Sequence, residues 1–187
     1  MQLRFATADD VPAMQAIYAP YVTETAISFE AAPPSVDEMR RRFDDTVPRY
    51  PWLVADETGV LGYAYAHRFA ERDAYDWSVE TSIYLDGAAR GRGVGSALYR
   101  ALLELLSAQG YRQAFGGVTL PNPASVALHE AFGYRRVATY TQVGYKLGEW
   151  RDVGWWQRAL DTDGDGPRVP VAVDTLDPAV VARALRV

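Results

Sequence analysis

The stretch Arg90-Gly91-Arg92-Gly93-Val94-Gly95-Ser96 lies between an expected strand and a strongly amphipathic segment. Its glycines allow a tight turn, and they let backbone N–H groups approach a ligand without a side chain in the way. A helix that starts here adds unpaired N–H donors and a partial positive charge, and the two arginines add formal charge. Together these features predict a cradle for a pyrophosphate.

Three kinds of glycine-rich loop bind phosphates in this way. A phosphate loop of the NTPase kind needs Gly-Lys-Ser/Thr at its end, and this stretch holds no lysine. A dinucleotide fingerprint needs G-x-G-x-x-G in the first βα unit, whereas the spacing here is G-x-G-x-G, deep in the chain. The acetyl-CoA pattern R/Q-x-x-G-x-G/A is matched by Arg90, Gly93 and Gly95. A plain glycine-rich turn with solvated arginines is the remaining alternative.

Apolar periodicity and turn residues divide the rest of the chain into strands and helices. Strands are expected at residues 2–6, 52–55, 60–68, 77–85, 113–120, 136–145 and 153–160. Helices are expected near 11–21, at 35–43, from the glycine-rich loop to Gly110, at 122–132 and, more briefly, at 178–185. We therefore predict one domain at 1–160, followed at 161–187 by a flexible acidic linker and C-terminal tail.

Composition excludes several classes of function. The 187 residues include no cysteine, so disulfides, thiolate metal sites and a cysteine nucleophile are ruled out. A net charge of −5 argues against a nucleic-acid partner, which needs clustered Lys and Arg. No segment approaches the roughly 18 apolar residues of a membrane span, and the N-terminus has no secretion-signal pattern. A cytoplasmic protein without nucleic-acid or membrane partners is the expectation.

The aspartate-rich run that follows Leu160 has the spacing of the first half of a calcium loop. It reads Asp161-x-Asp163-x-Asp165-Gly166. The twelfth position is Ala172, where such a loop needs a bidentate Glu. We therefore interpret the run as an acidic linker and predict no metal site, since the two histidines are also far apart in the chain.

Five blocks in a fixed order carry a family resemblance: YPWLVAD (50–56), AYDWSVETSIYL (74–85), RGRGVGSALY (90–99), LPNPASVALHEAFGY (120–134) and GEWRDVGWWQ (148–157). In these blocks the chain resembles the GNAT acetyltransferase superfamily. Within that superfamily it resembles the phosphinothricin and methionine sulfoximine acetyltransferases. The resemblance runs from about Leu3 to Leu160 and leaves out the tail.

The resemblance implies an α/β (α+β) GNAT fold. Its central sheet is mixed and mostly antiparallel, with helices on both faces, and its fourth and fifth strands splay apart. Acetyl-CoA would lie in that opening, with its pantetheine arm beside backbone groups of Ile83, Tyr84 and Leu85. The amides of residues 91–96 would take the pyrophosphate, and Asn122 and Ser125 would meet the far end of pantetheine.

Two residues are candidates for proton transfer. Glu80 lies mid-strand among apolar neighbours, where partial desolvation raises a carboxyl pKa and suits a general base. The matching Glu of the phosphinothricin-type enzymes has this role, although a charge on a half-exposed strand face is the alternative. His129 stands where many GNAT enzymes have a tyrosine that protonates the departing thiolate. We expect the oxyanion at a backbone N–H near Ile83 and a structural role for His67.

The resemblance suggests an amino-acid-like acceptor with a carboxylate. Arg72 could grip that carboxylate bidentately, and Tyr75 and Phe29 are candidate pocket walls. Ordinary packing is the alternative for all three. Similar enzymes form dimers, so a homodimer is expected. The competing functions are acetyl transfer to another amine (a protein N-terminus, a polyamine or an antibiotic) and a non-catalytic acetyl-CoA sensor.

Overall fold

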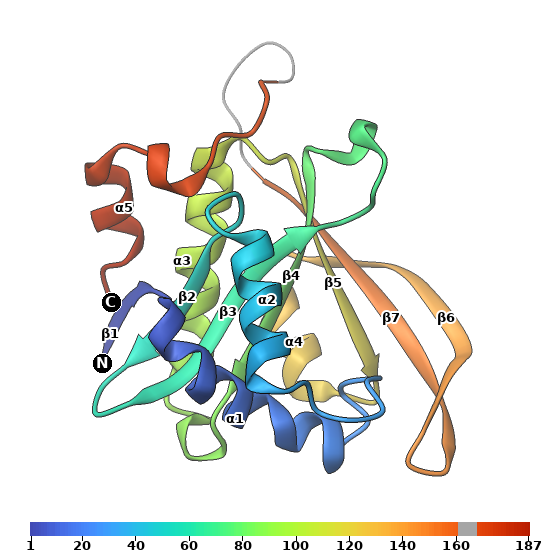
Figure 1. Ribbon diagram of the computed structural model, residues 1–187. Coiled ribbons are helices and arrows are strands. Elements are labelled where there is room, and N and C mark those ends of the chain that lie inside the picture. Colours follow the sequence, from blue (N-terminus) through green and yellow to red (C-terminus); the bar gives the residue numbers. More distant parts are fainter. Residues whose placement is uncertain (161–167) are drawn as a thin grey trace.

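The computed structural model of the chain, which describes residues 1–160 and 168–187, is built on one seven-stranded sheet (Figure 1). The strand order is β1-β2-β3-β4-β5-β7-β6, and every neighbouring pair is antiparallel except β4 and β5. The strands are β1 (Gln2–Phe5), β2 (Trp52–Asp56), β3 (Val60–Arg68), β4 (Ser78–Leu85), β5 (Gln113–Leu120), β6 (Arg135–Lys146) and β7 (Glu149–Ala159). The predicted mixed, mostly antiparallel sheet is confirmed.

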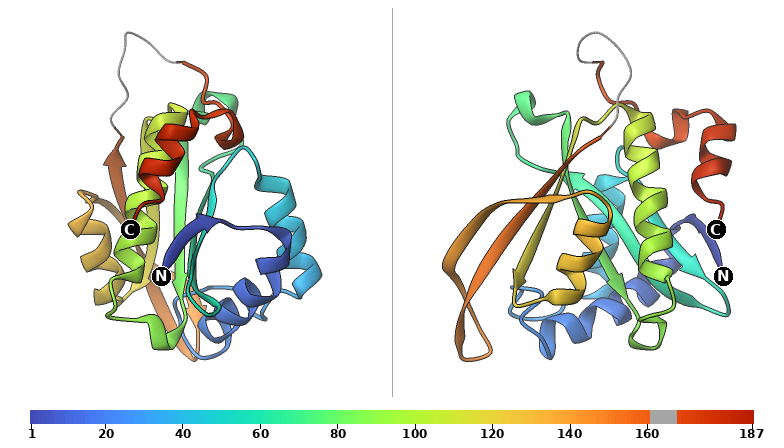
Figure 2. Two further views of the ribbon diagram at one scale, coloured as in Figure 1. Left: turned by 90° about the vertical axis from the view of Figure 1, so that its left-hand side faces the viewer. Right: turned by 180° about the vertical axis from the view of Figure 1, so that it is seen from behind.

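Helices cover both faces of the sheet, as predicted (Figure 2). The helices are α1 (Val11–Thr23), α2 (Val36–Thr46), α3 (Val94–Gln109), α4 (Pro123–Ala131) and α5 (Pro178–Ala184). α1 and α2 pack with β2 and β3 in one buried cluster, and α3 packs against the opposite face in the other. Two predicted boundaries were too short. α2 continues to Thr46, and β7 starts at Glu149 because a tight turn at Leu147 and Gly148, both with positive φ, joins it directly to β6.

The splay between β4 and β5 is the feature that makes room for a ligand. The two strands pair only where Ser78–Glu80 lie beside Gln113–Phe115. Beyond that point β4 stays paired with β3 as far as Leu85, and β5 stays paired with β7 as far as Leu120. The strands therefore diverge from one another (Figure 1), and the predicted opening is confirmed.

α3 anchors the glycine-rich loop to the core. Its leucines at 98, 102, 105 and 106 are fully buried, and each such side chain contributes about 1.5–3 kcal/mol by leaving water. Gly110 ends the helix in the left-handed conformation, with φ of 97°. The loop before α3 is thus held at the rim of the opening by a well-packed helix.

The described end of the chain packs along α3 (Figure 2). Val173 and Ala184 are buried in the main core. The Gln109 side-chain amide donates hydrogen bonds to the carbonyls of Arg49 (2.8 Å) and Val171 (2.7 Å). The aspartate-rich run at 161–166 lies outside the described residues. Within the described ranges, no helix is both long and apolar enough to cross a bilayer.

Candidate active site

The glycine-rich loop presents its backbone to open space at the start of α3. Gly91 and Gly93 have φ of 74° and 79°, a left-handed conformation that side chains rarely adopt. No atom lies within 4 Å of where a Cβ would stand at either glycine. Gly93 caps α3, so the first N–H groups of the helix, at Val94, Gly95 and Ser96, have no partner within the helix. The loop therefore offers open backbone N–H donors at the start of α3, and pyrophosphate binding by it stays a prediction.

The two arginines of the loop have different surroundings. The Arg90 guanidinium lies 5.4 Å from the centre of the Tyr21 ring. Arg92 makes a 2.9 Å ion pair with Glu57. Arg90 also lines a hollow of about 290 Å³ at the mouth of the splay, so it is the arginine that faces the opening.

Two adjoining hollows fill the opening between β4 and β5. Both are lined by Ile83, Asn122 and Ser125, which are three of the residues predicted to contact acetyl-CoA. Asn122 also caps α4, because its side-chain oxygen accepts a 3.2 Å hydrogen bond from Ser125 N–H. The inner hollow reaches Tyr84, and Leu85 lines the outer one. The N–H and C=O of Leu85 both contact the Tyr21 hydroxyl, a partner the sequence did not reveal.

Glu80 lies at the last β4–β5 pair, where the strands begin to part. Its Oε1 is 3.6 Å from the position of a Cβ on Gly117, so the carboxyl lies over β5. Burial raises the pKa of Glu80, and the nearby His67, with Nε2 4.0 Å from Oε2, opposes that rise. A carboxylate whose pKa is raised in this way is a stronger base near neutrality. His67 was expected to be only structural, and the structure places it directly beside Glu80.

His129 lies on the other face of the sheet, in the last turn of α4. Its Nε2 stands against Gly116, where a Cβ would overlap the imidazole ring. Neighbouring strand residues point to opposite faces of a sheet. The His129 imidazole over Gly116 and the Glu80 carboxyl over Gly117 therefore lie on opposite sides of β5. Nδ1–H donates to the Ser125 carbonyl at 2.7 Å, and Nε2 is 2.8 Å from the Tyr99 hydroxyl. Burial lowers the pKa of His129, and the Ser125 hydrogen bond opposes that effect.

A cavity of about 570 Å³ lies on the Glu80 face of the sheet. Arg72 and Tyr75, the two residues predicted to contact the acceptor, both line it. Its other walls include three aromatic rings. Phe69 stacks on Phe115 at 4.1 Å between centroids and meets Trp155 edge-on at 6.3 Å. The sequence did not single out these three rings, because each lies in a stretch that also suits ordinary core packing.

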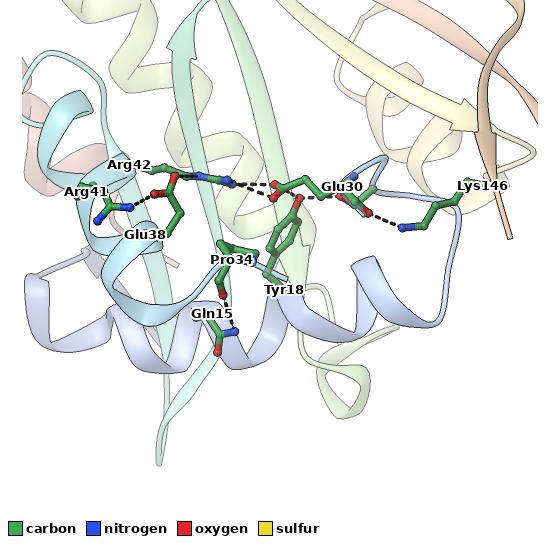
Figure 3. A network of polar contacts seen from close by, with 9 residues as sticks. Gln15, Tyr18, Glu30, Pro34, Glu38, Arg41, Arg42 and Lys146 are labelled. Atoms are coloured by element: carbon green, nitrogen blue, oxygen red, sulfur yellow. Dashed lines mark hydrogen bonds and ion pairs between the residues drawn. The ribbon is translucent and has the colours of Figure 1, made fainter. Parts of the chain in front are cut away.

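Phe29 is not among the residues that line this cavity. Its ring packs on β6 at Gly144, where any Cβ would overlap it. The segment around it is held in place by Glu30, whose carboxylate binds Arg42 at 2.7 Å and Tyr18 at 2.8 Å, while Lys146 donates to its carbonyl (Figure 3). Phe29 therefore belongs to the contact between the α1–α2 connection and β6.

Among the described residues, no group of three or more His, Asp or Glu side chains is arranged to hold a metal ion. The opening holds backbone donors at a helix N-terminus and a buried imidazole, and a carboxyl with a raised pKa lies where the opening begins. These are the groups that acyl transfer to an amine requires.

Comparisons with known proteins agree with this chemistry. Residues 3–155 match the family model described as "Acetyltransferase (GNAT) domain". The phosphinothricin N-acetyltransferase of Streptomyces viridochromogenes is 40% identical over 162 residues, which cover 86% of this chain and 88% of that protein. The L-methionine sulfoximine/L-methionine sulfone acetyltransferase of Pseudomonas aeruginosa is 32% identical over 168 residues, covering 88% of this chain and 98% of its own.

A solved structure is similar over nearly the whole chain. It is a GNAT superfamily phosphinothricin acetyltransferase from Sinorhizobium meliloti in complex with AcCoA. The two structures superpose with a TM-score of 0.86 and 39% sequence identity, covering 93% of this chain and 96% of that one.

Proposed function

The chain belongs to the GNAT acetyltransferase family and is an acetyl-CoA-dependent N-acetyltransferase, and from this premise we propose that its acceptor is a small amino-acid-like amine of the phosphinothricin or methionine sulfoximine type. The observation that carries the proposal is the cavity on the Glu80 face, where Arg72 and Tyr75 stand among aromatic walls. The names of two similar proteins point to the same class of acceptor.

Arg72 suits the carboxylate of such an acceptor. Its neighbour Arg68 is already engaged in ion pairs with Asp73 and Asp76, both at 3.2 Å. Arg72 lines the cavity, and within the described ranges it makes no ion pair of its own. A planar guanidinium binds a carboxylate through two parallel hydrogen bonds, which fixes orientation as well as affinity. The aromatic walls would then take the remainder of the acceptor.

In the proposed reaction Glu80 removes a proton from the acceptor ammonium, directly or through a water, so an N–H bond breaks and an O–H bond forms. The freed amine attacks the thioester carbon, and the oxyanion accepts a hydrogen bond from a β4 backbone N–H near Ile83. The tetrahedral intermediate loses the second N–H proton of the attacking nitrogen to solvent water, and the C–S bond breaks as the amide forms. His129 gives a proton to the departing thiolate, so an S–H bond forms.

Thiol release from acetyl-CoA across a panel of amines tests the acceptor. We expect turnover with phosphinothricin, methionine sulfoximine and methionine sulfone, and little with spermidine, an aminoglycoside or a peptide N-terminus. Arg72→Gln should raise the KM of the active acceptors about 10- to 100-fold, the effect of losing a charge-assisted pair, and leave the KM of acetyl-CoA unchanged.

Turnover with spermidine or the peptide at the rate of the amino-acid-like compounds would contradict this acceptor. If no amine in the panel is acetylated although the protein binds acetyl-CoA tightly, the result would favour the non-catalytic acetyl-CoA sensor. Arg68→Gln is a matched control, because it removes the same charge from a neighbouring arginine that is already paired.

We also propose a homodimer. The β6–β7 hairpin exposes a run of large apolar side chains to solvent: Val137, Tyr140, Val143, Tyr145, Leu147 and Trp150. Exposed aromatic and aliphatic side chains are typical of protein interfaces. Sedimentation equilibrium should give twice the 20.7 kDa chain mass, and a single-chain mass at micromolar concentration would contradict the dimer.

The predicted cytoplasmic location stays a prediction.

A further inference from the structure

A buried hydrogen-bond network lies behind His129, and the proposed reaction does not yet use it. Thr81 Oγ1 is 2.7 Å from Tyr99 Oη, 3.0 Å from Tyr134 Oη and 3.0 Å from the Phe115 carbonyl. Tyr99 Oη is in turn 2.8 Å from His129 Nε2. Thr81, Tyr99, His129 and Tyr134 are all buried. Every contact in this network therefore has to be met by the hydrogens that these groups carry themselves.

With a neutral His129 the network is one hydrogen short. Nδ1 faces the Ser125 carbonyl at 2.7 Å, and a carbonyl only accepts, so the single ring hydrogen must be on Nδ1. Thr81 must donate to the Phe115 carbonyl for the same reason, and Tyr134 donates to Thr81. Only the Tyr99 hydrogen is left, and two contacts need it, one with Thr81 and one with Nε2. In one of these two contacts, two lone pairs would then face each other with no hydrogen between the atoms.

With a protonated His129 the number of hydrogens equals the number of hydrogen-bond contacts. Nε2–H donates to Tyr99, Tyr99 donates to Thr81, Tyr134 donates to Thr81 and Thr81 donates to the Phe115 carbonyl. Nδ1–H keeps its bond to Ser125. Five contacts have five hydrogens, and both lone pairs of Thr81 Oγ1 are used. The side chains are thus arranged for the imidazolium.

We propose that Tyr99 and Thr81 are positioning residues that favour the protonated form of His129, so that its ring holds the proton that it later gives to the thiolate. This inference rests on the proposed function, in which His129 acts as the acid. When Nε2–H breaks and S–H forms, the ring returns to neutral and the network is again one hydrogen short, which favours reprotonation.

The charged and titratable groups around the network are few. Tyr99 keeps its hydroxyl hydrogen, because burial raises its pKa well above the usual value. Burial raises the pKa of Tyr134 as well, and Arg158 on β7 opposes that effect. Glu80 lies on the opposite face of the sheet, and its negative charge adds to the rise of the Tyr99 pKa. Glu130 on α4 accepts a 3.3 Å hydrogen bond from Trp156 Nε1. Burial by itself lowers the pKa of His129, so the network acts against that tendency.

An NMR titration of the two histidines in the full-length protein tests the inference without any substrate. Thr81→Val keeps the shape of the side chain and removes the acceptor of the Tyr99 hydrogen. Tyr99 can then donate freely to a neutral Nε2, so the His129 pKa should fall by about one pH unit. Tyr99→Phe should lower it too. His129→Gln assigns the resonance.

The matched control is Tyr134→Phe, which removes a hydroxyl from the same Thr81 oxygen. Tyr134 only donates to Thr81, so its loss leaves the one-hydrogen deficit as it was and the His129 pKa should stay within about 0.2 pH units. A His129 pKa that is unchanged or raised in Thr81→Val, with folding verified by its amide spectrum, would overturn the proposal. If the titration gives the expected result and the amine panel is silent, the proposed function fails and the network stands.

Discussion

Glu80→Gln should lower kcat about 10²- to 10⁴-fold, the range typical of a lost general base. Glutamine keeps the size of the side chain but cannot accept the proton of the acceptor ammonium. The affinity for acetyl-CoA should be unchanged, because Glu80 is not among the residues that line the two hollows between β4 and β5. Thiol-release kinetics give kcat, and calorimetry gives the acetyl-CoA dissociation constant.

The pH dependence separates a base from a structural carboxylate. In the wild type the acid limb of kcat/KM reports the Glu80 pKa, which burial raises and His67 lowers. His67→Gln removes the lowering group, so the limb should move to higher pH. The Glu80→Gln deficit should shrink in alkaline solution, where the acceptor amine loses its proton unaided. Unchanged turnover of Glu80→Gln at neutral pH would exclude Glu80 as the base.

Much of the fold and part of the site could be predicted because the relevant signals are local. The apolar periodicity of α3 and the glycines before it identify a helix with an exposed N-terminus, and both features lie within residues 90–110. Asn122 followed by Pro123 marks the start of α4 in the same way. Such signals need no knowledge of which strands are neighbours.

The features that sequence could not show depend on cross-strand register and on how segments far apart in the chain pack together. His67 is paired with Glu80 only because β3 and β4 align at those two residues. Thr81 and Tyr99 are 18 positions apart and look like ordinary core residues, yet their hydroxyls are 2.7 Å apart. The contact of the Phe29 ring with Gly144 depends on where β6 lies beside the α1–α2 connection, which the sequence does not show.

Gly116→Ala should lower kcat about 10²-fold without altering any proton-transfer group. The added Cβ would overlap the His129 imidazole, so the ring must leave the place where Tyr99 and Ser125 hold it. The loss should lie at the lower end of the range for general acids, because a thiolate leaves readily even when it is not protonated. His129→Gln should show a loss of the same size, and both should lose the alkaline limb of the kcat profile.

The double variant separates displacement of the ring from general damage to the strand. If Gly116→Ala acts only by moving His129, then combining it with His129→Gln should add no further loss, since both changes remove one function. Gly117→Ala is the stability control: its Cβ would meet the Trp155 ring at 3.5 Å and Glu80 Oε1 at 3.6 Å, ordinary contact distances. Thermal unfolding should show Gly117→Ala near the wild type and Gly116→Ala less stable by about 1–3 kcal/mol. Wild-type kcat in Gly116→Ala would mean that the imidazole is not needed where it lies, and His129 would then lose its place in the mechanism.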